Sequence, residues 1–501
     1  MKKIKYIFAS LLLSSFLACD TDYIIDPDNP EVAPSTHLVT SAQFDLAYEL
    51  NDQWTGARGT LGFAQYWAET FYTDENRYAL RTSQVDDLWE WPYRILTDLK
   101  KAIELIEDPQ TSEIMATYGD SNNQVQACRI MMAFTFSKLV DTFGDAPYWS
   151  YGQKNNVAFE GLRLEEGVTN PAYTDAQTIY EDILAELLDA ANKMDGSKTV
   201  FNNGDHLYDG DPNKWISFAH SIRLRLAAHI SGVNNALAVQ VFNESDSKAF
   251  NSITDEANFT YGLDDITGGP WHQAFTVEAR RDFGPALSFT ELLYNRVGPF
   301  TSITKEDPRT TQYFDTRLGT TEVVGIPYGF GNATARAVSD EGIPSSDIIK
   351  QNYKQPILTY SEIEFIRSEF NGWNQTNYEN GVKASMMFWG VSNTDADNYV
   401  AMLPAANEET VLTQKYIALY MDGLEAWTEY RRTGYPNTLS VPGDTFGSAT
   451  FTTLVPGLNT IPNRVNYPQK EQLLNNSNWD AARQGLSDGD TMISKLFWDV
   501  N

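Results

Sequence analysis

The sequence predicts a mainly α fold, in which degenerate helical hairpins are joined by long irregular loops and a few short strands. Apolar residues recur at the helical period through much of the chain, and helix-capping residues frame several of these runs. Segments with strand character are short and few. The 501 residues are 42% apolar and contain no clear internal linker, so we expect a single large packed body.

The N-terminus has the pattern of a lipoprotein signal. A basic stretch, Met1–Lys5, precedes an apolar run over 6–17, which is too short for a membrane span of about 20 residues. Leu17-Ala18-Cys19 then resembles a bacterial lipobox, so we expect residues 1–18 to be cleaved and Cys19 to be acylated, for example with palmitate. An ordinary secretory signal with a chance cysteine is the alternative. Residues 19–39 are acidic and proline-containing, which predicts an extended tether.

The first strong helix of the body is predicted over 125–143. Its apolar face contains Val125, Cys128, Met132, Phe136, Leu139 and Phe143. Gly144 and Pro147 follow it and end the pattern. Cys128 lies on the apolar face, so we interpret it as a small buried hydrophobe.

Later helices are predicted from their starts and stops. Capping-box spacing begins at Thr174 and again at Ser361, and a third apolar stripe runs from Lys214. A helix over 413–432 ends before Gly434, a typical C-terminal glycine. The helical scaffold is therefore placed mainly in 40–235 and 357–432.

Strands and loops fill the rest of residues 40–501. The best strand candidates are 321–327 and 451–455. Long irregular segments rich in Gly, Pro, Asn, Asp and aromatic residues are expected at 197–213, 250–285, 297–356 and 433–480. Ordered loops of that length usually carry function.

Composition and motifs exclude several classes of activity. The net charge of −30 argues against a nucleic-acid partner, and the two cysteines and five scattered histidines form no disulfide framework or zinc motif. No nucleophile elbow, P-loop or dinucleotide fingerprint is present, so no enzyme activity and no cofactor is predicted, although a glycosidase carboxylate pair is not excluded. Asp205, Asp209 and Asp211 could hold a structural Ca²⁺, but a turn before the Lys214 helix is the favoured interpretation.

Aromatic residues are in excess and gather in three clusters. Trp89, Trp91 and Tyr93 lie near the start of a helix predicted from Tyr93 or Arg94, Trp271 follows a Gly-Gly-Pro sequence, and Tyr328 has flexible neighbours. Flat rings can stack on the apolar faces of sugars, so we predict a ligand site on these loops. Trp89 and Trp271 rank first, and Asn76 and Arg77 are candidate polar contacts. The alternative for each ring is that it fastens its loop to the core.

Several blocks of sequence resemble the SusD/RagB family of outer-membrane nutrient-binding lipoproteins. The matching blocks are Gln65–Thr70, Tyr72–Tyr78, Leu139–Tyr148, Gly210–Asp211, Lys214–Trp215, Phe218–Ala219, Ser221–Ala227, Gln414–Tyr420, Gly423–Trp427, Tyr430–Pro436, Arg464, Tyr467–Pro468 and Glu471. The similarity runs from about residue 40 to the end and implies a SusD-like scaffold of tetratricopeptide-like helices. We interpret the charged residues in these blocks as ion pairs that position helices. They are Arg223, Arg225, Glu425, Arg431 and Arg432.

The resemblance also implies a function. A SusD-like protein lies as a lid on a SusC-like, TonB-dependent outer-membrane transporter, binds glycan oligomers at the cell surface and passes them on for polysaccharide utilisation. It would be anchored in the outer membrane by the lipid on Cys19 and would catalyse no reaction. The alternative is the same complex importing peptides or another nutrient. An acidic surface would not suit strongly acidic polysaccharides, although a local pocket can invert the global charge.

Overall fold

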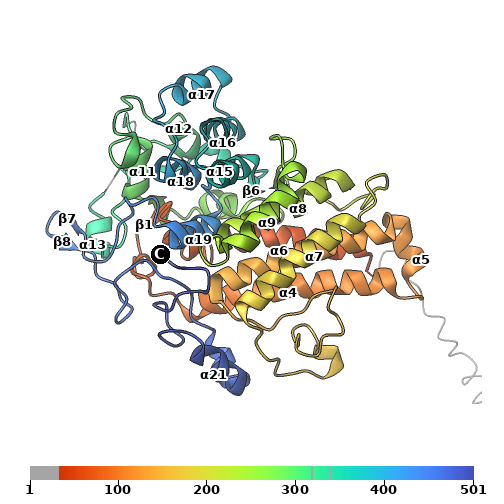
Figure 1. Cartoon of the computed structure of the whole chain (residues 1–501). Helices are drawn as coiled ribbons and strands as arrows, with labels where there is room; N and C mark the ends of the chain where they lie inside the picture. Colours follow the sequence, from red (N-terminus) through yellow and green to blue (C-terminus); the bar gives the residue numbers. More distant parts are fainter. Residues whose placement is uncertain (1–32, 318–319, 339) are drawn as a thin grey trace, which may run out of the picture. The chain divides into compact units, whose positions relative to one another are not determined.

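The computed structural model describes residues 33–317, 320–338 and 340–501, so Cys19 and the predicted signal peptide lie outside the described residues. Residues 35–501 form one compact unit, in which helices dominate (Figure 1). The helices with the greatest length are α2 Ser35–Tyr48, α4 Thr82–Glu107, α6 Ser121–Phe143, α7 Ala176–Lys193, α8 Pro212–Ile230, α9 Asn235–Ser245, α15 Tyr360–Phe370, α16 Gln375–Phe388, α18 Glu408–Ala418 and α19 Gly423–Thr433. The predicted mainly α fold is confirmed.

The long helices pack mostly on their neighbours in the chain. Helix α2 lies against α4, α4 against α6, α6 against α7, α7 against α8 and α8 against α9. A second group joins α15 to α16 and α18, and α16 to α17, Asn393–Val400. This succession of neighbouring helices is what helical-hairpin repeats produce, because each repeat buries its apolar face against the next. No helix among the described residues has the length and apolar character needed to cross a membrane.

Helix ends largely follow capping chemistry, but several lie a few residues from the predicted positions. Asp175, rather than Thr174, caps α7 by accepting a hydrogen bond from the Thr178 amide at 3.0 Å. Helix α2 begins at Ser35, inside the segment predicted as tether. The predicted helix over 413–432 is wrong, because a turn divides it into α18 and α19. Met421 has φ 71° there, and Asp422 caps the second helix.

Helix α4 begins at Thr82, well before the helix start predicted at Tyr93 or Arg94. The Gln84 side chain accepts a hydrogen bond from the Arg81 amide at 2.7 Å, which starts the helix at Thr82. Pro92 lies inside the helix and removes one backbone donor, but packing of the apolar face on α2 and α6 maintains the helical path. The rings of Trp89, Trp91 and Tyr93 therefore project from a helix and not from a loop.

Strands are short and form two-stranded antiparallel pairs. The pairs are β1 Trp67–Glu69 with β3 Phe283–Pro285, β2 Ala257–Thr260 with β6 Lys354–Leu358, β4 Phe314–Asp315 with β5 Ile343–Pro344, and β7 Thr445–Phe446 with β8 Ala449–Thr450. The predicted strands at 321–327 and 451–455 are wrong. Val324 and Ile326 form only isolated bridges, and β8 ends before Phe451.

The remaining helices are single turns or short segments in the irregular regions. They are α3 Thr60–Phe63, α5 Ser112–Met115, α10 Pro270–His272, α11 Leu287–Leu293, α12 Thr310–Tyr313, α13 Asn332–Ala335, α14 Ser346–Ile349, α20 Gln469–Leu474 and α21 Asn476–Gln484. Helix α10 corrects the expectation that the chain around Trp271 is not helical. Pro270 occupies the first helical turn, where its missing N–H costs no hydrogen bond.

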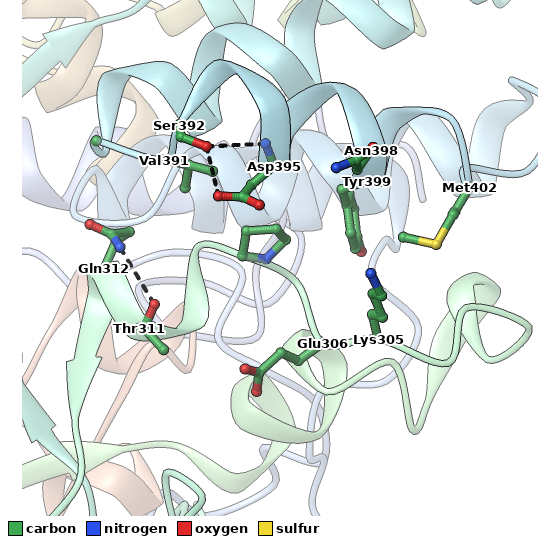
Figure 2. A pocket seen from close by; sticks show the side chains of 12 residues that line it. Lys305, Glu306, Thr311, Gln312, Val391, Ser392, Asp395, Asn398, Tyr399 and Met402 are labelled. Carbon is green, nitrogen blue, oxygen red and sulfur yellow. Dashed lines mark hydrogen bonds between the residues drawn. The ribbon is translucent and has the colours of Figure 1, made fainter.

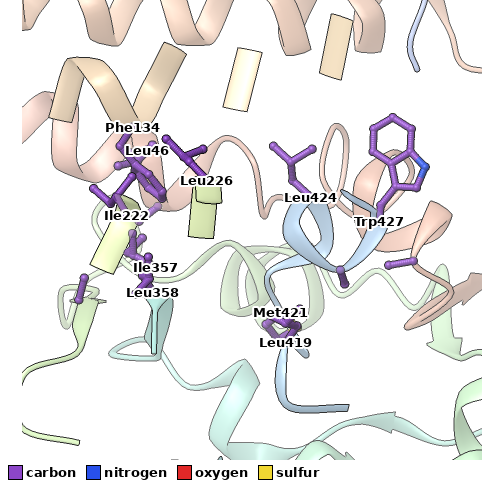
Figure 3. Packing of buried hydrophobic residues seen from close by; sticks show 14 of the residues in the cluster. Leu46, Phe134, Ile222, Leu226, Ile357, Leu358, Leu419, Met421, Leu424 and Trp427 are labelled. Atoms are coloured by element: carbon purple, nitrogen blue, oxygen red, sulfur yellow. The ribbon is translucent and has the colours of Figure 1, made fainter. Parts of the chain in front are cut away.

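One hydrophobic core runs through the unit and is crossed by ion pairs. Leu46, Phe134, Ile222 and Leu226 pack together where α2, α6 and α8 meet, as Figure 3 shows. Beside them the buried Arg225 contacts Glu362 at 2.5 Å and lies 3.1 Å from Asp422 and 3.3 Å from Glu425. These pairs tie α8 to α15 and α19.

The other charged residues of the family blocks also join helices. Arg432 contacts Glu369 at 2.7 Å and Glu429 at 2.8 Å. Arg431 donates to the backbone oxygens of Asp141 and Asn463. The predicted helix-positioning role of these residues is confirmed.

Candidate functional site

Four of the sequence-predicted ligand residues are buried. Trp89 is 6% exposed and Trp271 is 1% exposed, with the Trp271 ring stacked on Trp67 at 4.7 Å between centroids. Tyr328 and Asn76 are also buried in the core. Little of the surface of these side chains is open to a ligand. Their burial favours the alternative, in which the rings fasten their segments to the core, and their assignment as ligand contacts stays an untested prediction.

Trp91 and Tyr93 are half-buried and, with Trp89, line a groove of about 660 Å³ beside α20. The Arg94 guanidinium lies 4.4 Å from the centroid of the Trp91 ring, and the Tyr93 hydroxyl donates to the Pro147 oxygen at 2.9 Å. We call this the α4 groove; its other lining residues are Asp45, Glu90, Thr97, Asp98, Lys470, Glu471 and Leu474. Burial, with the nearby charge of Asp98, raises the pKa of Asp45 to about 6. The groove is acidic and offers one partly exposed tryptophan.

A different surface collects the exposed aromatic rings that sequence reasoning missed. Trp54, Phe71 and Tyr72 are 38%, 41% and 54% exposed. Trp54 is the only exposed tryptophan in the described part of the chain, and Phe446 is the only other exposed aromatic residue there. Arg280 lies over the Trp54 ring and Arg336 over the Phe71 ring, and Arg281 follows Arg280 in the chain. We call these three rings and three arginines the aromatic–arginine surface.

The β1–β3 pair brings the two halves of this surface together. The antiparallel register pairs Glu69 with Phe283, and the Thr70 amide extends it by donating to the Asp282 oxygen at 2.7 Å. The Thr70 hydroxyl also donates to the Arg281 oxygen at 3.1 Å, which brings the segment of Phe71 to the segment of Arg281. Tyr72 has φ 62°, so the chain turns away from the ladder at this point.

Helix α13 supplies the third side of the surface. The amide and the hydroxyl of Thr73 both donate to the Asn332 side-chain oxygen at 3.0 Å, which holds the Phe71 loop against the start of α13. Arg336 follows that helix, and its guanidinium lies 4.3 Å from the Phe71 ring centroid. Arg77, a sequence-predicted polar contact, borders the same loop; it is partly exposed and pairs with Asp74 at 2.6 Å.

The Trp54 ring packs against two arginines that belong to an ionic cluster. The Arg58 and Arg280 guanidinium carbons lie 4.6 Å and 4.7 Å from the centroid of the Trp54 ring. Arg58 is buried and contacts Glu69 at 3.0 Å and Asp282 at 3.4 Å. Burial raises the pKa of the Glu69 carboxyl to about 9, although the charge of Arg58 opposes this shift. Trp54 is thus held in place by its arginine contacts.

A second cavity, of about 600 Å³, lies between α17 and the segment 305–312 (Figure 2). Its wall is polar, with Lys305, Glu306, Asn398 and the Ser392–Asp395 hydrogen bond of 2.6 Å. The one ring in its lining, Tyr399, is buried. This cavity therefore lacks the open ring faces that a sugar would stack on.

The three aspartates considered for Ca²⁺ serve the turn before α8. The Asp205 carboxylate accepts hydrogen bonds from Gln43 at 2.9 Å, from the Trp215 indole at 2.8 Å and from three backbone amides. Asp211 caps α8, and Asp209 is exposed. These hydrogen bonds account for the acidic sequence without a metal, and Ca²⁺ binding there stays an untested prediction.

A protein-family model described as "Starch-binding associating with outer membrane" matches residues 27–468 of this chain. The chain belongs to the SusD-like family. A search of curated proteins found no match.

Solved structures agree with the family and share its fold. A chitin-binding protein matches with a TM-score of 0.75 and 21% identity over 93% of this chain and 100% of its own. A chitin-binding SusD homologue from Flavobacterium johnsoniae matches with a TM-score of 0.72 and 21% identity over 93% and 98% of the two chains. A SusD homologue from Parabacteroides distasonis matches with a TM-score of 0.75 and 20% identity over 93% of this chain and 98% of its own. At these identities the likeness shows the fold.

Proposed function

We propose that this SusD-like protein binds glycan oligomers at the cell surface and uses the aromatic–arginine surface to do so. The exposed rings of Trp54, Phe71 and Tyr72 carry the proposal, because exposed aromatic side chains are otherwise almost absent from the described residues. Hydrogen bonds to a sugar largely replace hydrogen bonds to water, so net affinity depends on apolar stacking. Two structural neighbours are named as chitin-binding, which supports a glycan as the ligand.

The protein would work as the binding component of an uptake complex. In this role it covers a SusC-like, TonB-dependent transporter, is anchored in the outer membrane through lipidated Cys19, and carries out no reaction. The description of the family model links such proteins to the outer membrane, which supports this location. Gentle detergent extraction should co-purify a large outer-membrane transporter with the folded protein, and its repeated absence would contradict the complex.

A glycan array followed by calorimetry on Phe71→Ala and Trp91→Ala tests where the ligand binds. Loss of a stacking ring should weaken binding by about 1–3 kcal/mol, a scale taken from stacking on nucleobases. We expect this loss for Phe71→Ala, with an unchanged unfolding midpoint, and no loss for Trp91→Ala. The reverse result would place the site in the α4 groove. Binding to peptides and not to any glycan would support the alternative ligand class instead.

A further inference from the structure

Charge sets the aromatic–arginine surface apart from the rest of the protein. The chain carries a net charge of −30, and most of its described arginines lie within 4.0 Å of a carboxylate. Arg281 and Arg336 are the only exposed arginines of the described residues that form no such ion pair. Neither guanidinium makes a hydrogen bond to any described residue either. Both belong to the surface that presents the exposed rings.

The two unpaired cations belong to segments that meet next to one ring. The Arg336 guanidinium lies 4.3 Å from the centroid of Phe71. The Arg281 backbone oxygen accepts a hydrogen bond at 3.1 Å from the hydroxyl of Thr70, the residue before Phe71. A ligand that stacks on Phe71 would therefore meet the charge of Arg336, with Arg281 on the adjoining segment.

The carboxylates nearby are mostly engaged. Asp282 contacts Arg280 at 2.6 Å and Arg58 at 3.4 Å, and Asp74 contacts Arg77. Glu69 is buried in the core and contacts Arg58 at 3.0 Å, so it is also paired with a cation. Glu278 is exposed and keeps its negative charge, because its partner Gln53, at 2.8 Å, is a neutral amide. Among the described residues, however, no carboxylate pairs with Arg281 or Arg336, so the charge of these two side chains is not neutralised.

We propose that the aromatic–arginine surface selects anionic oligosaccharides, which carry carboxylate or sulfate groups, over neutral ones. This inference rests on the proposed glycan-binding function. A guanidinium forms paired, charge-assisted hydrogen bonds with a carboxylate or sulfate, and these are stronger than bonds to a neutral hydroxyl. The overall negative charge does not prevent binding, since salt screens exposed charges beyond about 8 Å at physiological ionic strength, while the two arginines act at contact distance.

Matched ligand pairs test this selection with the full-length protein in detergent. One pair is a galacturonate oligomer and its fully methyl-esterified form, and the other is a galactan oligomer with and without sulfate. We expect the charged member of at least one pair to bind about tenfold or more tightly, as expected for one charge-assisted contact. Raising the salt from about 0.05 to about 0.5 M should weaken binding of the charged member only.

Variants assign the effect to the two arginines. Arg281→Gln and Arg336→Gln should each lose about tenfold in affinity for the charged ligand, a larger loss than for its neutral counterpart, and leave the unfolding midpoint unchanged. Arg336→Lys should retain part of the preference, because it keeps the charge. Arg483→Gln is the matched control, since Arg483 also lies over an aromatic ring, 4.9 Å from the centroid of Trp479, but outside this surface.

The possible failures are distinguishable. Equal binding of charged and neutral members, or preference for the neutral ones, would overturn the anionic selection while glycan binding stands. A charged preference that survives both glutamine variants would also overturn it, because the arginines would not be responsible. Binding to no glycan at all would refute the proposed function and this inference together.

Discussion

Replacing Trp89 with alanine should destabilise the fold and should not act primarily on ligand binding. The ring is 6% exposed, although the sequence ranks it first as a ligand contact. Its centroid lies 5.1 Å from Phe143 and 5.6 Å from Tyr467 in edge-to-face contacts, and 5.9 Å from Tyr173 in a stacked one. Truncation removes these contacts and leaves a cavity between α4 and its neighbours.

The cost follows from the size of the buried ring. Removing a buried tryptophan side chain costs about 3–5 kcal/mol, and aromatic pairs add about 0.5–1.5 kcal/mol each beyond the buried area. We therefore expect the free energy of unfolding to fall by about 5 kcal/mol, the upper end of the range for a buried tryptophan. Denaturant unfolding followed by circular dichroism measures this change. Phe71→Ala is the matched control, and its stability should stay within about 0.5 kcal/mol of the parent.

One result would refute this reasoning. Suppose that Trp89→Ala unfolds at the same denaturant concentration as the parent and binds a glycan more weakly. The ring would then contact the ligand, and it would not be buried in the functional protein. The same pair of measurements on Trp271→Ala provides a second, independent test, because that ring is stacked on Trp67 in the core.

Three further predictions concern the ionic core and the membrane anchor. Arg225→Met should lower the free energy of unfolding by about 3–5 kcal/mol, because the carboxylates of Glu362, Asp422 and Glu425 lose their shared cation; a loss below about 1 kcal/mol in denaturant unfolding would contradict this. Burial alone would lower the pKa of His229, but the charges of Glu425 and Asp141 raise it above its usual 6.5. Its contribution to stability is therefore complete below about pH 6.5 and lost as pH rises through the folded pKa, so His229→Gln should flatten the stability profile above that pH. Cys19→Ala should abolish acyl labelling and membrane retention, and a variant that still labels would exclude lipidation at that residue.

Sequence periodicity predicts the helices well because burial imposes it directly. The apolar face over 125–143 gives α6, and Gly144, with φ 91°, ends it where expected. Apolar periodicity fails to show a helix end where a turn interrupts the helix without changing the spacing of the apolar residues. Met421 divides α18 from α19 through one left-handed residue, which no run of apolar positions reveals. Short strands are missed for a related reason, since β1 has only three residues, all buried, and shows no alternation.

The candidate site is harder to predict than the fold because it depends on exposure and not on residue type. Trp89 and Trp54 are chemically the same, but the rings of Phe143, Tyr173 and Tyr467 bury the first, while the second is 38% exposed. The β1–β3 pairing and the Thr70–Arg281 hydrogen bond bring the segments of Phe71 and Arg281 together across more than 200 positions of sequence. The unpaired state of Arg281 and Arg336 is equally invisible in a chain with 67 acidic residues, where a partner is expected for every cation. In so acidic a protein, two arginines that remain without a carboxylate partner after folding are available to bind an anionic ligand.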